Sequence, residues 1–138
     1  MSQNPKQLEV KMPGSGAIRK PWNKIYNAMR HSAGPNSDRS SLKDLTVTVE
    51  DLVDIFEQQQ GRCHWLGIKL NPLNNYISRS PLAVSVDRID NNEGYHKYNI
   101  VLCCRLANLG RGSYNYEDFR RVVEYVKEEI CGQKNNEE

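Results

Sequence analysis

Three polar residues, Asp87, Asn99 and Asn108, are spaced so that one small folded unit could bring them to a single metal ion. One carboxylate with neutral oxygen ligands is a set that suits Mg²⁺, which keeps several waters and takes the rest of its shell from substrate phosphate. The first hypothesis is therefore chemistry on phosphate esters. It requires that the segments that carry these residues fold back on one another.

The segments around these residues predict a strand, a loop, a second strand and a short helix. Residues 83–89 alternate and are rich in β-branched side chains, and residues 91–94 (NNEG) supply turn chemistry. Residues 99–102 predict the second strand, and residues 103–110 a helical turn or two that ends at a glycine. This order lays the first strand beside the helix, so Asp87 and Asn108 are expected to face one cation, Mg²⁺ or Mn²⁺.

The pattern V-D-R-x-D-x-x-x-G-Y-x-x-x-N-x-x-L-x-C-x-x-x-N over residues 86–108 resembles the HNH, or ββα-metal, nuclease family. The resemblance implies an endonuclease in which Asp87 and Asn108 hold the metal and Asn99 braces the loop. Most members have a histidine general base directly after the metal aspartate, and here that position is Arg88. Arginine at this place is similar to a PacI-like branch of the family, in which Arg88 would be a phosphate clamp.

Several residues are candidates for the general base or nucleophile that would replace the missing histidine. Tyr26, in a Tyr-Asn-Ala segment, matches the part of the PacI-like branch that carries a tyrosine nucleophile, but its position also fits an apolar helix face. His96 lies in the loop between Asp87 and Asn99 and is either a displaced base or an exposed loop histidine. Asp90 fits a brace of the loop better than a base.

Composition and charge describe one small domain with a basic beginning. The chain has 138 residues, enough for one modest core. Residues 1–45 carry eight Lys or Arg against three Asp or Glu, a net charge of +5, which leaves −3 for the rest. A basic arm attracts a phosphate backbone, although a solvated arm has the same composition. No apolar run of membrane-spanning length and no signal peptide is recognisable, so we expect a soluble protein in the cytoplasm of a bacterial or phage-infected cell.

Helical periodicity outside residues 83–110 predicts three further helices. Pro21 opens one with an apolar stripe at Trp22, Ile25 and Met29 that closes at His31. A capping box at Thr48 and Asp51 opens a second, which ends before Gly61. Residues 116–131 predict a core helix closed by Gly132. The expected fold is α+β: a flexible arm over 1–20, one domain over 21–132 and a frayed tail over 133–138.

Several cations are candidates for contacts to double-stranded DNA, the partner that the resemblance implies. They are Lys20, Lys24, Arg30, Arg79 and Arg111. A chain of this size covers a short stretch of duplex, so a homodimer that cuts both strands of a palindrome is one expectation. A monomeric nickase and a branched-DNA resolvase fit the same residues.

The four cysteines, Cys63, Cys103, Cys104 and Cys131, are expected to be thiols and not disulfides. Nucleases of this kind often hold structural zinc on two C-x-x-C pairs, but Leu66 and Ala107 stand where the second members would be. No structural zinc is therefore expected, and Cys63 and Cys104 should lie near one another as small buried side chains.

The sequence thus favours a Mg²⁺-dependent DNA endonuclease. A DNA-binding module that has lost catalysis and a zinc-stabilised interaction domain remain as alternatives. The DNA sequence recognised and the oligomeric state are not determined by these residues.

Overall fold

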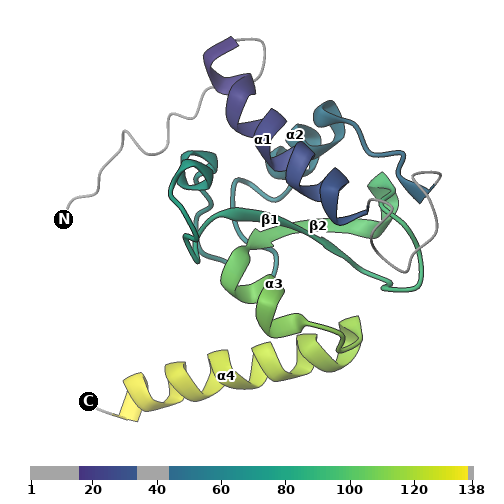
Figure 1. Cartoon of the computed structure of the whole chain (residues 1–138). Helices are drawn as coiled ribbons and strands as arrows, with labels where there is room; N and C mark the ends of the chain where they lie inside the picture. The colour runs from purple at the N-terminus through teal and green to yellow at the C-terminus, as the bar shows by residue number, and fades with distance from the viewer. Residues whose placement is uncertain (1–15, 34–43, 137–138) are drawn as a thin grey trace.

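The computed structural model describes residues 16–33 and 44–136, and these form an α+β fold around a two-stranded antiparallel sheet (Figure 1). The elements in chain order are α1 (Gly16–Ser32), α2 (Val49–Gln58), η3 (Pro72–Tyr76), β1 (Val84–Arg88), η4 (Lys97–Asn99), β2 (Ile100–Cys104), α3 (Arg105–Arg111) and α4 (Tyr116–Asn136), where η marks a 3₁₀-helix.

The predicted strand, loop, strand and helix are confirmed as elements. β1 and β2 pair in a register that sets Val84 opposite Cys104 and Arg88 opposite Ile100. Every residue of β2 is buried, so this strand is the centre of the core. α3 follows β2 directly and packs back against both strands.

Helix α1 covers the hairpin through its apolar stripe of Trp22, Ile25 and Met29, all nearly inaccessible. It begins at Gly16, five residues before the predicted start, with Pro21 inside it. Pro21 is the sixth residue of α1, beyond the first four N–H groups, which have no intrahelical partner, so it removes one intrahelical hydrogen bond near the helix start. The helix start predicted at Pro21 was wrong; residues 1–15 of the predicted arm lie outside the described residues.

Helix α2 has the predicted start and end. The Thr48 side chain accepts from the Asp51 N–H, and the Asp51 carboxylate accepts from the Thr48 N–H. Gln60 and Gly61 then adopt positive φ angles of 57° and 70°, which stops the helix. Its buried face meets α1, where the rings of Trp22 and Phe56 lie 5.1 Å apart.

Helix α4 differs from the predicted core helix. It starts as expected, with Asn115 Oδ1 accepting from the Asp118 N–H, and its first turns pack on the core through Phe119. Val126 and Ile130 on the same stripe are 46% and 59% exposed, and the helix runs through Gly132 to Asn136. Figure 1 shows α4 projecting away from the hairpin beyond these docked turns. The prediction of a core helix closed at residue 132 was thus wrong for most of its length.

Within residues 16–33 and 44–136, no helix is both long and apolar enough to cross a membrane.

Candidate metal site and nucleic-acid groove

Asp87, the predicted carboxylate ligand, is buried in an ion pair. The residue is 5% exposed, and its two carboxylate oxygens lie 3.1 and 3.0 Å from one terminal nitrogen, Nη1, of Arg111. The indole N–H of Trp65 donates to Oδ2 at 2.9 Å. The carboxylate therefore accepts three hydrogen bonds from buried donors.

Arg111 is completely buried, which excludes it as a surface contact to DNA and corrects that expectation. Besides Asp87, its guanidinium donates to the carbonyl oxygens of Arg88, Ile89 and Tyr114. The rings of Trp65 and Tyr116 lie 5.8 and 6.0 Å from its central carbon. Arg111 thus joins the end of β1 to the turn that precedes α4.

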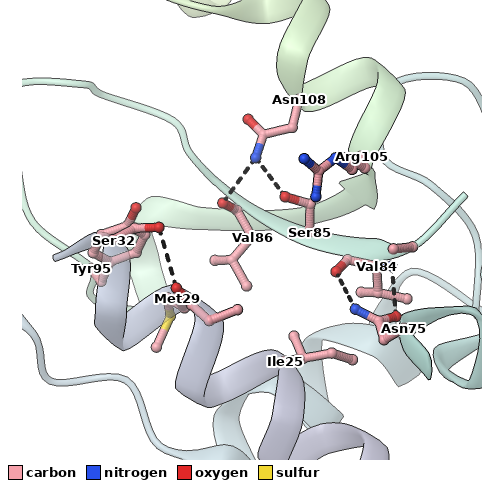
Figure 2. Close-up of a pocket in the computed structure, with 12 residues that line it drawn as sticks. Ile25, Met29, Ser32, Asn75, Val84, Ser85, Val86, Tyr95, Arg105 and Asn108 are labelled. Carbon is pink, nitrogen blue, oxygen red and sulfur yellow. Dashed lines mark hydrogen bonds between the residues drawn. The ribbon is translucent and has the colours of Figure 1, made fainter. Parts of the chain in front are cut away.

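Asn108, the second predicted ligand, contacts a different part of β1. Its Nδ2 donates to Ser85 Oγ at 2.6 Å and, more weakly, to the Val86 carbonyl at 3.4 Å, while its oxygen is turned away from the strand (Figure 2). Ser85 and Asp87 share one face of β1, as do Asn108 and Arg111 on α3. The helix and the strand therefore make two successive pairs, Asn108 with Ser85 and Arg111 with Asp87.

A divalent cation does not fit between Asp87 and Asn108 in this arrangement. The Asp87 carboxylate is already neutralised and hydrogen-bonded by Arg111, and an added cation would lie close to a buried positive charge. Among the described residues, no three His, Cys, Asp or Glu side chains are grouped in a way that could hold a metal. The described residues at this position therefore do not form a metal site.

Asn99 braces the loop between the strands. It is 4% exposed; its Oδ1 accepts from the Asp90 N–H at 2.9 Å, and its Nδ2 donates to the carbonyls of Asp90 and Gly94. The Asp90 carboxylate accepts from the Asn92 N–H at 2.9 Å, an Asx turn. Both side chains have a structural role in this loop, and any part of Asn99 in catalysis stays a prediction.

The remaining candidates for catalysis are dispersed. Arg88 donates to the Glu93 carbonyl at 3.0 Å and lies over the Tyr95 ring. His96 Nδ1 lies 2.7 Å from the Thr46 hydroxyl, and its ring stacks on Tyr98. These contacts join Arg88 to the loop between the strands and His96 to Thr46 and Tyr98.

Tyr26 packs partly buried against the core on α1. At 100° per residue, it lies on one flank of the Trp22–Ile25–Met29 stripe, while Ala28 and Ser32, which face the pocket beside Asn108, lie on the other flank. This position fits the alternative in which Tyr26 belongs to the apolar face of the helix. The tyrosine nucleophile remains a prediction for which this geometry offers no partner.

Cys63 and Cys104 lie together in the core, as predicted. Cys63 Sγ accepts a hydrogen bond from the Leu66 N–H. Burial raises the pKa of both the Cys103 and the Cys104 thiol. Cys103 and Cys104 are therefore protonated packing side chains at neutral pH.

A histidine that the sequence left without a partner, His64, joins α4 to the hairpin. Its Nε2 lies 2.8 Å from the Tyr116 hydroxyl, and its ring meets Trp65 edge to face. Burial lowers the pKa of His64, and the nearby Asp87 partly opposes this effect. No spacing in the sequence connects residues 64 and 116, so periodicity could not have found this contact.

A basic groove of about 930 Å³ runs between α1, the η3 turn and the start of α3. Three of the predicted DNA contacts, Lys20, Lys24 and Arg79, line it together. Arg105 and His31 add to them, and among the described residues that line the groove there is no Asp or Glu. Arg30 is exposed on α1 but does not line the groove. Arg105 was missed because its position depends on how α3 packs on β1.

A smaller pocket of about 240 Å³ adjoins this groove and shares Ala28, Asn75, Ala83 and Arg105 with it. Figure 2 shows Asn108, Ser85 and Arg105 on one side of this pocket and Ile25, Met29 and Ser32 of α1 on the other. The groove thus leads from the N-terminal part of α1 to the surface of β1 beside Asn108.

Comparisons with family models, curated proteins and solved structures find no match to this chain. Function is therefore argued from the site itself.

Proposed function

We propose that this protein binds DNA through the basic groove between α1 and η3, on a hairpin–helix unit of HNH type. The observation that carries the proposal is the gathering of Lys20, Lys24, Arg79 and Arg105 around one groove, with no carboxylate among the described residues of its lining. A phosphate backbone is the polyanion that such a row of cations attracts, by direct charge pairing and by release of condensed counterions.

The backbone at Arg79 supports a functional role for this residue. Arg79 has a φ angle of 58°, in the left-handed region that costs a residue with a side chain on the order of 1–2 kcal/mol. Its side chain is exposed and lines the groove. A cation held in this conformation is oriented for a ligand.

Tyr76 on the opposite side of the groove from α1 adds an aromatic surface. The Lys24 ammonium lies 5.8 Å from the centre of its ring, and the side chain is 54% exposed. Aromatic faces next to cations stack on unpaired bases as well as on sugars. The groove therefore has the chemistry to bind a strand by its backbone with little selection among sequences.

Fluorescence anisotropy with a labelled DNA duplex tests the proposal. Lys24→Glu and Arg105→Glu should each weaken binding by about tenfold and reduce the slope of log K against log salt by about one. Arg121→Glu is the matched control, because Arg121 is an exposed guanidinium on α4 outside the groove. Equal losses for all three variants would contradict the groove as the binding site. Single-stranded DNA and RNA of the same sequence, measured in parallel, define the preferred strand form.

A Mg²⁺-dependent DNA endonuclease, with Mn²⁺ as a substitute metal, is the second candidate. It is favoured by one observation: β1, the loop braced by Asn99, β2 and α3 follow the order that the HNH resemblance implies. Asp87 lies near the end of β1, and Asn108 lies on α3 and contacts β1 at Ser85. This candidate requires Arg111 to release Asp87. Pairing of two copies to cut both strands belongs to the same candidate.

Nicking of supercoiled plasmid separates the two candidates. DNA binding alone gives no nicks with Mg²⁺ or Mn²⁺ above the level with a chelator. If metal-dependent nicking occurs and is lost in both Asp87→Ala and Asn108→Ala under conditions where circular dichroism shows each variant to be folded, the endonuclease candidate is supported. Tyr26→Phe and His96→Ala then identify the base or nucleophile, since only the variant that lacks it would lose activity by about a hundredfold.

A further inference from the structure

We infer that the Arg111 guanidinium takes the place of a divalent metal ion at Asp87. Asp87 then has a structural role: it binds Arg111 and so holds β1 to α3. The inference does not rest on the basic groove, because neither residue lines it. It contradicts the endonuclease candidate and is compatible with the DNA-binding one.

Hydrogen-bond capacity at both ends of the pair supports this assignment. A guanidinium has five N–H donors and a carboxylate about four acceptor sites. Arg111 uses all three of its nitrogens on Asp87, on two carbonyls at the end of β1 and on the Tyr114 carbonyl. Asp87 receives three hydrogen bonds, one of them from Trp65. A pair so completely satisfied leaves little for an added ligand.

Burial makes the pair permanent in the folded state. The side chains of Arg111 and Asp87 are 1% and 6% exposed, and no described buried side-chain nitrogen or oxygen lacks a hydrogen-bond partner. A cation that approached Asp87 would have to displace a guanidinium that could not reach water without disturbing the Trp65 and Tyr116 rings beside it. The single carboxylate is thereby committed to Arg111.

The role of this pair is to fix three segments to one another. Arg111 comes from the end of α3, Asp87 from β1, and the Tyr114 carbonyl from the turn before α4. Trp65 adds the segment that follows α2. A structural metal ion holds separate segments together by coordinating ligands from each of them. Here one arginine side chain does the same by donating hydrogen bonds to three carbonyl oxygens and a carboxylate.

The indole N–H of Trp65 is a direct reporter of Asp87 in the intact chain. Only Trp22 and Trp65 give indole signals in heteronuclear NMR, and Trp65→Phe assigns them. We expect the Trp65 signal to keep its position with millimolar Mg²⁺ and to keep its intensity with substoichiometric Mn²⁺, which is paramagnetic. Loss of the Trp65 signal with Mn²⁺, abolished by Asp87→Asn, would overturn the inference. This measurement on the wild-type chain stands even if variants fail to fold.

Thermal melting with and without Mg²⁺ gives the second readout. Arg111→Met and Asp87→Asn should each lower the melting temperature by on the order of 10 °C or more, and the double variant should lose less than the sum. Arg121→Met, which removes an exposed guanidinium, should change it little. A wild-type melting temperature that rises with Mg²⁺, and no longer does so in Asp87→Asn, contradicts the inference.

Discussion

The side chain of Asn75 is hydrogen-bonded to both backbone groups of Val84: its Oδ1 accepts from the Val84 N–H at 2.8 Å, and its Nδ2 donates to the Val84 carbonyl at 2.9 Å. An amide side chain here acts as a short extra strand for the first residue of β1 (Figure 2). This contact fixes the η3 segment, which carries Tyr76 and precedes Arg79, to the hairpin. The uncharged residue Asn75 thereby holds in place the η3 side of the basic groove.

Asn75→Ala should loosen that wall without changing its charge. Loss of both hydrogen bonds leaves the two Val84 groups unsatisfied, so the free energy of unfolding should fall by about 1–3 kcal/mol. DNA affinity should fall as well, because Tyr76 and Arg79 lose their fixed positions. Chemical denaturation and anisotropy measure the two effects. Asn74→Ala is the control, since the Asn74 side chain has no hydrogen bond to another described residue; an equal loss there would contradict the role of Asn75.

Arg79→Asn and Arg79→Gly should separate stability from binding. Asparagine and glycine both tolerate the left-handed φ angle, so we expect unfolding free energies unchanged or raised by up to about 1 kcal/mol. Both substitutions remove a cation from the groove, so DNA affinity should fall and the salt slope should decrease by about one. A variant that is less stable and binds DNA as well as the wild type would show that the strain at Arg79 has no connection with binding.

His64 should make the fold less stable in mild acid. Burial lowers its folded pKa below the ordinary value of 6.5, so the unfolded chain binds more protons between the two pKa values. Stability from the neutral imidazole is therefore complete above pH 6.5 and decreases as the pH falls toward the folded pKa. His64→Gln should flatten this part of the profile of melting temperature against pH. His31→Gln, which removes an exposed imidazole on α1, is the matched substitution for comparison.

Two glycines should respond to alanine in opposite directions. A Cβ atom at Gly94 would overlap the backbone oxygen of Asp44, to which the Tyr95 N–H donates at 2.7 Å. Gly94→Ala should therefore lower the free energy of unfolding by about 2 kcal/mol or more. Gly132 lies inside α4, where the methyl group of an alanine would point into open space, so Gly132→Ala should raise the free energy of unfolding by about 0.5–1 kcal/mol. Denaturant titration of the two variants checks both signs.

The sequence by itself determined the elements and several of their local contacts. The capping box of Thr48 and Asp51 was predictable because it joins residues three apart in a fixed local geometry. The hairpin and α3 followed from β-branched alternation, turn residues and a terminal glycine, which also act over a few residues. Lys24 could be expected on the predicted helix, whereas Lys20 fell in the predicted arm and shares a face with Lys24 only because α1 begins at Gly16.

Only the tertiary structure decided which side chain faces which. A helix can slide along a strand without any change in its own periodicity, so the sequence could not determine that α3 pairs Arg111 with Asp87 and Asn108 with Ser85. For the same reason, the sequence could not determine whether the apolar stripe of α4 is buried. Its pattern defines an apolar face, but whether other segments cover that face depends on residues far away in the chain. The contact between His64 and Tyr116 likewise spans 52 residues of chain and exists only because α4 docks beside Trp65.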